Sequence, residues 1–332
     1  MRDPNFWWRR PSVAAALLAP IAAGYGAIAA ARMRKNGARA GVPVLCVGNF
    51  TLGGAGKTPT AIALARMLTD AGESVFCLSR GYGGNIAGVK LVDPHSHTAA
   101  QVGDEALLLA RAAPTIVARN RVAGAKLARA KGASVVIMDD GLQNGSIAKD
   151  FALAVVDARR GVGNARVFPA GPLRAPLAAQ LATAHALLVV GDGNAAGALE
   201  GFARSRGRPV LHGRLVPDAA AVTALKQRQV FAFAGIGDPE KFFATAEAAG
   251  IAIAARRSFP DHHDYTAEEA AALVMEAEHQ GLPLLTTEKD HARMSGNPAL
   301  TALQARAMVL PVTLVVEEAE ELRKLALDAM GP

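Results

Sequence analysis

One stretch decides the fold: Gly48-Asn49-Phe50-Thr51-Leu52-Gly53-Gly54-Ala55-Gly56-Lys57-Thr58. An apolar run over residues 42–47 precedes it, and an amphipathic helical pattern over residues 60–68 follows it. When a glycine-rich loop joins a strand to a helix, its backbone N–H groups bind phosphates, the lysine reaches the β- and γ-phosphates, and the next hydroxyl binds Mg²⁺. The pattern therefore predicts a P-loop nucleotide site. The residues expected around the phosphates are Thr51, Leu52, Gly53, Gly54, Ala55, Gly56, Lys57 and Thr58.

Thr51 is the irregular position of this loop, because the usual pattern has glycine five residues before Gly56. A glycine-rich turn with a chance lysine is the alternative interpretation. The apolar run before the loop and the helical pattern after it favour the nucleotide site.

Length and composition limit the class of protein. The chain has 332 residues, of which 51% are hydrophobic and 5% aromatic, so two domains with large cores are expected and disorder is not. The net charge of +7 suits an anionic partner such as a nucleotide, a phospholipid or a phosphorylated substrate. Nucleic acid is not expected, because the chain has no dense basic run with interleaved aromatics. Cys46 and Cys77 fall in predicted buried strands and indicate core residues in a reducing compartment.

A second acidic motif supports the nucleotide site. Ser134-Val135-Val136-Ile137-Met138-Asp139-Asp140 is an apolar run that ends in two aspartates. This is typical of the Walker B strand, whose acid holds Mg²⁺ opposite the phosphate loop. Strand and helix patterns alternate through this region and predict an α/β fold, in which a P-loop NTPase domain has a mostly parallel sheet covered by helices on both faces.

The N-terminal segment combines aromatic, basic and apolar residues. Phe6-Trp7-Trp8-Arg9-Arg10 precedes an uncharged stretch over residues 11–31. Paired tryptophans beside arginines suit a membrane interface. A membrane-seated helix, a cleavable signal peptide and a plain packing helix all fit the pattern. Basic residues flank the stretch on both sides, so we expect shallow seating on the cytoplasmic face and not a defined span.

Polar residues follow several predicted strands, where ligands meet open α/β sheets. Arg80 and Tyr82 lie in a glycine-rich turn and are candidates for substrate contact, although a plain turn with an exposed arginine explains them equally well. Asp104 and Glu105 precede an apolar helical run. They suit helix caps, and in a kinase an acid at this place could also orient a hydroxyl or a metal.

Three more arginines are candidate phosphate ligands. Arg119 and Arg121 follow a short predicted strand, and a solvated helix face explains them equally well. Arg174 is the only charge in the proline-rich loop Phe168-Pro169-Ala170-Gly171-Pro172-Leu173-Arg174-Ala175-Pro176. This loop is too rich in proline for a buried helix.

The chain divides into three expected parts. Residues 1–35 form an N-terminal membrane-associated helix, residues 36–216 the P-loop domain, and residues 217–332 a smaller C-terminal α/β domain. The last part holds Phe259-Pro260-Asp261-His262-His263-Asp264-Tyr265, whose spacing fits no defined zinc motif and favours a histidine that orients a catalytic acid. It also holds Thr287-Glu288-Lys289-Asp290, in which the adjacent lysine and aspartate break the guanine-reading pattern of GTPases.

These motifs together resemble one family, the tetraacyldisaccharide 4'-kinases of lipid A biosynthesis. The resemblance spans nearly the whole chain, keeps the family's order, and includes threonine or serine at the position of Thr51. An N-terminal membrane-associated helix is also a family feature. The matching stretches are Gly48-Asn49, Thr51-Leu52-Gly53-Gly54-Ala55-Gly56-Lys57-Thr58-Pro59, Ser79-Arg80-Gly81-Tyr82-Gly83, Gly103-Asp104-Glu105, Asp139-Asp140-Gly141-Leu142-Gln143, Pro169-Ala170-Gly171-Pro172-Leu173-Arg174, Asp261-His262 and Thr287-Glu288-Lys289-Asp290.

The resemblance implies a reaction at the cytoplasmic face of the bacterial inner membrane. ATP with Mg²⁺ would phosphorylate the 4'-hydroxyl of an acylated glucosamine disaccharide 1-phosphate, giving lipid IVA, and the enzyme would act as a monomer. Asp104 matches the catalytic acid, His262 its partner, and Lys57 the phosphate-binding lysine. Since Asp104 and His262 lie on different predicted domains, we expect ATP binding to close them. The implied metal set is Thr58, Glu105, Asp139, Asp140 and Gln143, and the implied substrate set is Asn49, Arg80, Tyr82, Arg119, Arg121 and Arg174.

Two positions depart from the family pattern. Asn144 stands where the family usually has histidine, and Ala175 where it has glutamate. Two rival functions also stay open, a membrane-tethered nucleotide switch or partitioning ATPase, and a soluble P-loop kinase or ligase acting on a small molecule. Nucleotide turnover with and without the glycolipid distinguishes these classes.

Overall fold

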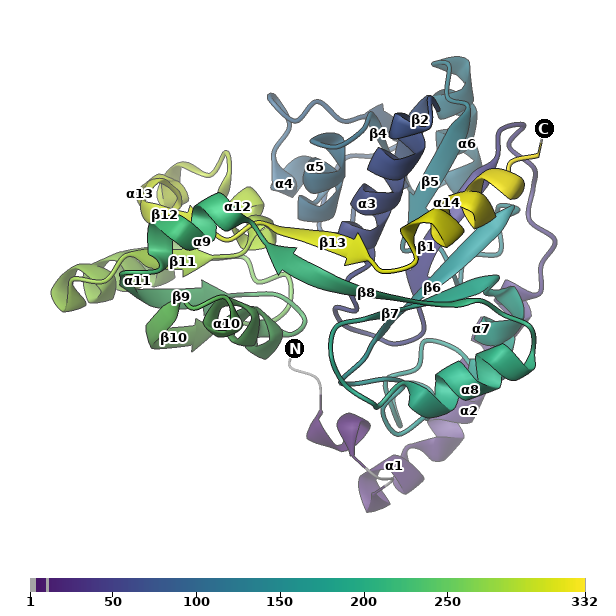
Figure 1. Cartoon of the computed structure of the whole chain (residues 1–332), viewed down its shortest axis with the longest axis horizontal. Helices are drawn as coiled ribbons and strands as arrows, with labels where there is room; N and C mark the ends of the chain where they lie inside the picture. The colour runs from purple at the N-terminus through teal and green to yellow at the C-terminus, as the bar shows by residue number, and fades with distance from the viewer. Residues whose placement is uncertain (1–3, 10–11, 332) are drawn as a thin grey trace.

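The computed structural model describes residues 4–9 and 12–331 and contains two sheets (Figure 1). Arg10 and Pro11 of the expected N-terminal motif lie outside the described residues, as do residues 1–3 and 332 of the expected first and last domains. We call residues 218–311 the small-sheet unit and the other described residues the large-sheet unit. The expected α/β class is confirmed.

The large sheet has nine strands in the order β13-β8-β7-β6-β1-β5-β2-β4-β3. Neighbouring strands run parallel except at the two edges, where β13 and β3 are antiparallel to their neighbours. The mostly parallel sheet predicted from the sequence is therefore confirmed. The strands are β1 (Val44–Asn49), β2 (Val75–Ser79), β3 (Val89–Leu91), β4 (Thr115–Ala118), β5 (Val135–Asp139), β6 (Phe151–Asp157), β7 (Ala186–Val190), β8 (Val210–Pro217) and β13 (Val312–Val316).

Helices cover both faces of this sheet because its strands are apolar on both sides. In β1, Val44 and Cys46 face one core, whereas Leu45 and Val47 face the other. Cys77 belongs to the second core, and both cysteines are buried and free, as expected. The helices of this unit are α3 (Lys57–Asp70), α4 (Ala99–Val102), α5 (Asp104–Ala110), α6 (Arg121–Ala130), α7 (Leu177–Thr183), α8 (Gly197–Ser205) and α14 (Ala319–Asp328).

The small sheet has four parallel strands in the order β10-β9-β11-β12. Phenylalanines of β9 pack on one face, and its valine and alanines on the other. The elements are α9 (Ala219–Leu225), β9 (Gln229–Ala234), α10 (Pro239–Ala248), β10 (Ala252–Ser258), α11 (Ala267–Gln280), β11 (Leu284–Thr286), α12 (Glu288–Met294), η2 (Pro298–Leu300), α13 (Thr301–Arg306) and β12 (Ala307–Val309).

The end of the chain returns to the large sheet. β13 pairs along β8, and Leu322 and Ala326 of α14 pack in the same core as α3. In Figure 1, β8 and β13 run side by side as the two connections between the units. Residues 312–331 thus join the large-sheet unit, although the sequence places them within the expected third part. We propose that the smaller domain comprises residues 218–311.

The N-terminal segment forms three short helices instead of one uncharged helix. They are η1 (Asn5–Trp8), α1 (Val13–Leu17) and α2 (Ala19–Met33). Pro20 in the first turn of α2 suits a helix start, which places the break at Leu18. Among the described residues, no helix has the length and apolar character needed to cross a membrane.

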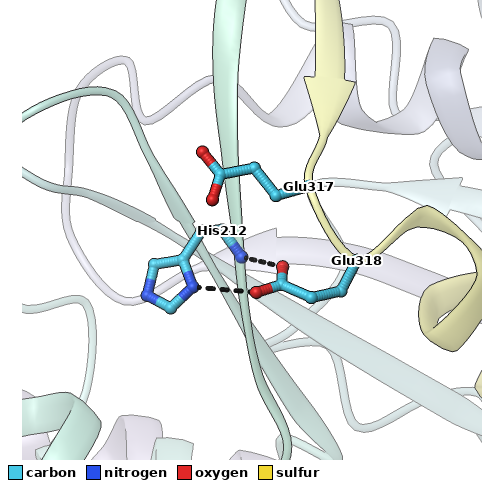
Figure 2. Close-up of side chains that lie close together, drawn as sticks. All are labelled: His212, Glu317 and Glu318. Atoms are coloured by element: carbon cyan, nitrogen blue, oxygen red, sulfur yellow. Dashed lines mark hydrogen bonds and ion pairs between the residues drawn. The ribbon is translucent and has the colours of Figure 1, made fainter.

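Figure 2 shows how His212 of β8 anchors the returning chain. Its backbone N–H donates to Glu318 Oε2 over 2.7 Å, and its ring contacts Glu318 over 3.2 Å and Glu200 over 3.3 Å. Burial lowers the pKa of His212, but the bonds to Glu318 and Glu200 outweigh burial and raise this pKa above its ordinary value. Protonated His212 thus links β8, α8 and the start of α14.

We expect His212 to stabilise the fold only at lower pH. A raised folded-state pKa gives stability that is complete below the unfolded pKa of about 6.5 and is lost as pH rises through the folded value. The melting-temperature difference between the parent and His212→Gln should be largest near pH 6 and should shrink above pH 8. His279→Gln, at an exposed position of α11, is the control. A difference that is the same at all pH values would contradict the assignment.

Candidate active site

A cleft of about 1580 Å³ lies between the two units. Residues 52–59 of the glycine-rich loop line one side, and Gly237, His262 and Lys289 of the small-sheet unit line the other. The loop between β9 and α10 lies close to the glycine-rich loop, since a Cβ atom added to Gly237 would lie 2.7 Å from the backbone nitrogen of Gly54. The units therefore meet around the predicted phosphate loop.

The glycine-rich loop connects β1 to α3, as predicted. Its entry is extended: Thr51 forms an antiparallel bridge with Leu173, and Leu52 N–H donates to the Pro172 carbonyl over 2.8 Å. Arg174 Nε donates to the Thr51 carbonyl over 2.9 Å. Any residue type adopts an extended backbone, which explains why threonine replaces the usual glycine here.

The two aspartates at the end of β5 face this loop. Thr58 Oγ1 donates to Asp139 Oδ2 over 3.4 Å, and Lys57 Nζ lies 3.9 Å from Asp140 Oδ1. Burial raises the pKa of Asp140, but Lys57 and Arg174 outweigh burial and hold it at about 2. Burial lowers the pKa of the Lys57 ammonium. The two acids of the predicted Walker B strand therefore lie beside the phosphate loop.

Asp139 lacks the partners that a buried carboxylate needs. Its Oδ1 atom is buried and accepts no hydrogen bond among the described residues. Burial, and then the charges of Glu105 and Asp140, raise its pKa to about 7. An unpaired buried charge is costly, so Asp139 fits a site for a cation that prefers oxygen ligands.

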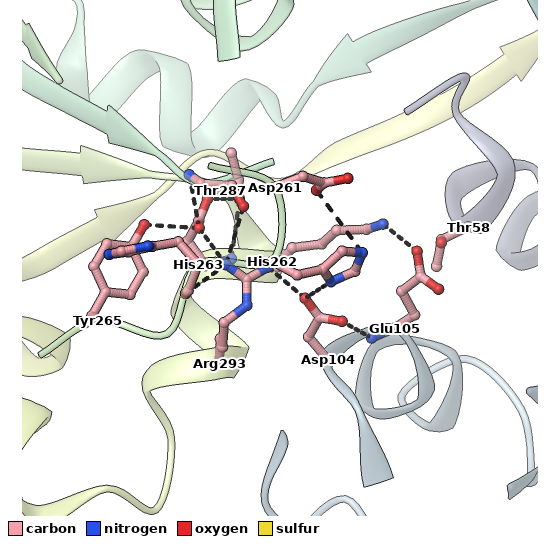
Figure 3. Close-up of polar contacts among 12 residues, drawn as sticks. Thr58, Asp104, Glu105, Asp261, His262, His263, Tyr265, Thr287 and Arg293 are labelled. Atoms are coloured by element: carbon pink, nitrogen blue, oxygen red, sulfur yellow. Dashed lines mark hydrogen bonds and ion pairs between the residues drawn. The ribbon is translucent and has the colours of Figure 1, made fainter. Parts of the chain in front are cut away.

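Asp104, the first residue of α5, is a second buried carboxylate, next to the cleft-lining residues Glu105 and His262 (Figure 3). Its Oδ1 accepts the Glu105 backbone N–H over 2.8 Å. Its Oδ2 lies 3.4 Å from His262 Nδ1 and accepts from Arg293 Nη2 over 2.6 Å. Burial raises the pKa of Asp104, but these donors and the Lys289 ammonium outweigh burial and keep the pKa below its ordinary value. The structure thus brings Asp104 and His262 together across the two units.

Two cations on one face of α12 meet the two adjacent acids of α5. Lys289 and Arg293 are four residues apart and so lie on the same side of the helix. Lys289 Nζ donates to Glu105 Oε1 over 2.7 Å, and Arg293 contacts Asp104. The sequence interpretation stopped at Asp290 and missed Arg293. The four-residue spacing from Lys289 was the available signal.

His262 has an unusual backbone. Its φ is +54°, a left-handed conformation, and its N–H donates to the Gly235 carbonyl over 3.1 Å. Its ring packs against Tyr82 with the centroids 4.7 Å apart. Burial lowers the pKa of His262, but Asp104 outweighs burial and raises it. Non-glycine residues held at positive φ concentrate at functional sites.

Comparisons with known proteins now decide the family. Residues 14–330 match the family model LpxK, described as tetraacyldisaccharide-1-P 4'-kinase. The chain belongs to the LpxK family. It is 55% identical over 331 residues to a tetraacyldisaccharide 4'-kinase of Rhodopseudomonas palustris (strain BisB5), covering 100% of this chain and 97% of that one. It is 57% identical over 312 residues to one from Methylobacterium sp. (strain 4-46), covering 94% of each chain.

A solved structure also resembles this LpxK family member. The structure of LpxK from Aquifex aeolicus in complex with ATP has 26% sequence identity and a TM-score of 0.71. The match covers 95% of this chain and 99% of that chain. The family resemblance inferred from the motifs is therefore confirmed.

The remaining predicted residues of this LpxK family member divide by exposure. Arg80, Tyr82 and Arg119 are exposed and line the cleft. Arg121 also lines the cleft, but its guanidinium is buried and donates to the carbonyls of Ala118 and Asp139.

Two predicted residues, Asn49 and Gln143, lie around the base of the glycine-rich loop. Asn49 is fully buried, and its amide donates to the Gly53 carbonyl over 3.3 Å. This bond ties Asn49 to the loop, and its expected contact with the sugar stays a prediction. Gln143 lines the cleft, and its Nε2 donates to the Asn49 carbonyl over 2.7 Å and to Gln180 Oε1 over 2.6 Å.

The two departures from the LpxK pattern have simple local roles. Asn144 Oδ1 accepts the Ser146 N–H over 2.8 Å and the Ser146 hydroxyl over 2.7 Å, which fixes the turn after β5. Ala175 is fully buried, and its carbonyl accepts from Gln180 Nε2 over 2.7 Å. A methyl group there packs in the core and has no polar role.

Proposed function

We propose that the cleft transfers the γ-phosphate of ATP to the 4'-hydroxyl of tetraacyldisaccharide 1-phosphate, giving lipid IVA. One observation supports this most strongly: the buried Asp104 carboxylate is paired with His262, which lines the same cleft as the phosphate loop. A nucleotide switch needs no such pair. The family and its relatives supply the acceptor.

The phosphate loop and its acids handle the nucleotide. The N–H groups of residues 52–58 surround the phosphates, and the Lys57 ammonium offsets negative charge on the transferred group. Thr58, Asp139, Asp140 and Glu105 would hold Mg²⁺, with Gln143 nearby. The unpaired Asp139 Oδ1 and the raised pKa of this carboxyl support that assignment. When bound, Mg²⁺ supplies charge stabilisation to the phosphates.

Asp104 acts on the sugar. A hydroxyl is a poor nucleophile near pH 7, and an ionised carboxylate within hydrogen-bond reach accepts its proton as the new O–P bond forms. Because its pKa is low, Asp104 is ionised but is a weak base. It therefore acts mainly by orienting the hydroxyl, and positioning and electrostatics supply most of the rate. His262 holds the carboxylate from the other unit, which suits closure of the two units on ATP.

The exposed basic residues meet the acceptor. Arg80 and Arg119 line the mouth of the cleft beside Tyr82. Guanidinium groups bind phosphate in a planar, bidentate geometry, and a tyrosine ring packs on a sugar face. Arg121 and Arg174 support the site from below, since they hold the Asp139 carbonyl and the Asp140 carboxylate.

An apolar stripe on the N-terminal helices leads to this cleft. Val13, Leu17, Ile21, Tyr25 and Ile28 recur every three or four residues and are 42–77% exposed, whereas Ala22, Gly26 and Ala30 of α2 are buried. Tyr25 and Ile28 of α2 also line the cleft. We propose that the stripe lies in the cytoplasmic face of the inner membrane, that acyl chains stay in the bilayer there, and that the enzyme acts as a monomer.

The stripe gives a testable prediction. Leu17→Gln with Ile21→Gln should weaken binding to phospholipid vesicles by about 10-fold or more, because each side chain contributes about 1.5–3 kcal/mol on burial. ATP affinity should not change. Met275→Gln, at a position 68% exposed on the small-sheet unit, is the matched control. Equal loss of vesicle binding and ATP affinity would count against membrane seating.

Acceptor-dependent turnover tests the proposed function. ADP release should be slow with ATP and Mg²⁺ alone and should rise strongly when tetraacyldisaccharide 1-phosphate is added in detergent micelles. Fast ADP release without the glycolipid would favour the rival ATPase switch. Stimulation by a soluble sugar with no acyl chains would favour a small-molecule kinase.

A further inference from the structure

Arg293 lies behind the proposed site and has no assigned role. It belongs to α12 of the small-sheet unit, and its side chain is only 8% exposed. Its Nη2 donates to Asp104 Oδ2 over 2.6 Å, across the interface between the units. Its Nη1 donates to three groups of its own unit, which are Asp290 Oδ1 at 3.0 Å, the Gly235 carbonyl at 3.1 Å and the His263 carbonyl at 3.2 Å. One guanidinium therefore joins the proposed base to the framework of the opposite unit.

That framework is a hydrogen-bond network around Asp290, and Figure 3 labels three of its members, Tyr265, Thr287 and Arg293. Asp290 is fully buried and accepts from the Tyr265 hydroxyl over 2.8 Å, the Gly235 N–H over 3.0 Å and the Thr287 hydroxyl over 2.6 Å. Gly235 directly follows β9 and Thr287 is the N-cap of α12, whereas Tyr265 lies just before the N-cap of α11. The carboxylate in turn fixes the plane of the Arg293 guanidinium.

The contact of Asp104 with Arg293 is shorter than its contact with His262. The Arg293 bond is 2.6 Å, whereas His262 Nδ1 lies 3.4 Å from the same oxygen. The Asp104 side chain is 3% exposed, so water does not replace a lost partner. The other oxygen is held by the Glu105 N–H of its own helix, and Lys289 is bonded to Glu105. Arg293 is thus the closest side-chain contact that orients the carboxylate from the opposite unit.

We propose that Arg293 is a positioning residue for phosphoryl transfer: it fixes the orientation of the Asp104 carboxylate and aligns it when the two units meet. The proposal rests on the function proposed above, since it acts through Asp104. Arg293 is not one of the described residues that line the cleft, and its Nη1 and Nη2 atoms donate to four protein acceptors. A displacement of about 1 Å in an aligned group costs about 10²-fold in rate.

A double-mutant cycle tests the proposal. Arg293→Met should lower kcat about 10²-fold with little change in KM for ATP, because the phosphate loop keeps its contacts. Arg293→Lys should recover part of the loss, since an ammonium reaches the carboxylate but lacks the planar fork. In an Asp104→Asn background, Arg293→Met should cost less than about 2-fold more. Arg306→Met, which removes an exposed ion pair with Glu278 on the same unit, is the matched control and should leave kcat unchanged.

Three outcomes would overturn the inference. They are an unchanged kcat for Arg293→Met, equal kcat losses for the methionine and lysine variants, and an additive loss in the Asp104→Asn background. If Arg293→Met does not fold, as judged by circular dichroism, the same cycle with Arg293→Lys decides by its additivity. Full activity of Asp104→Asn alone would instead overturn the proton-accepting role given to Asp104 above, and a parent protein that does not phosphorylate the glycolipid would overturn the proposed function.

Discussion

Asp104→Asn should lower kcat for glycolipid phosphorylation by about 10²–10⁴-fold, the range that a positioned proton acceptor contributes. Asparagine keeps the size of the side chain and the backbone N–H acceptor, but it cannot take the hydroxyl proton. Asp104 lies at the start of α5, and its hydrogen bonds and ion pairs go to Glu105, Arg293 and His262 and not to the phosphate loop, so the Kd for ATP should change little. The result would locate the loss in the chemical step and not in nucleotide binding.

A control variant separates loss of the Asp104 carboxylate from the general effect of replacing an aspartate by asparagine. Asp93→Asn alters an exposed aspartate in the loop after β3, whose carboxylate accepts from Ser96, and should keep full activity. Melting curves of both variants should show that each is folded at the assay temperature. Retention of more than half the parental kcat by folded Asp104→Asn would contradict its role as proton acceptor.

Lys57→Met should lower kcat/KM for ATP by about 10²–10³-fold, the cost of removing one preorganised charge from a transition state. The ammonium is buried in the loop and lies 3.9 Å from Asp140. Methionine preserves the aliphatic length of the side chain but leaves the phosphate charge and Asp140 without this cation. Both ATP affinity and turnover should therefore fall.

Lys126→Met is the matched control for this substitution, because it removes an exposed ammonium from α6. ATP binding is measured by equilibrium titration, and turnover by ADP release in the presence of glycolipid. An unchanged kcat/KM for folded Lys57→Met would show that the nucleotide phosphates bind elsewhere.

Local patterns predicted the nucleotide half of the site well. The apolar run before the glycine loop became β1, the periodic segment after it became α3, and the apolar run that ends in two aspartates became β5. In each case the signal and the structure lie within a few adjacent residues, so propensity and periodicity are sufficient. Asp139 and Asp140 follow from the same logic, because parallel strands end at one edge of the sheet.

The interface between the units was harder to predict. Asp104 and Arg293 are 189 residues apart in sequence, and no local pattern specifies that α5 and α12 meet. The return of β13 to the large sheet is equally non-local. The burial of Asn49 was not predicted either: the family resemblance implied a place near the glycolipid, and the fold shows that its amide donates to the Gly53 carbonyl.

The central claim is that one cleft, built from both units, moves phosphate from ATP to a lipid-anchored sugar hydroxyl. Incubation of the parent protein with γ-labelled ATP, Mg²⁺ and tetraacyldisaccharide 1-phosphate tests it most directly, with the products separated and the phosphate position read by ³¹P NMR. The account predicts that the label appears on the glycolipid at the 4'-position, in step with ADP. Label recovered only as inorganic phosphate, with the glycolipid unchanged, would contradict it.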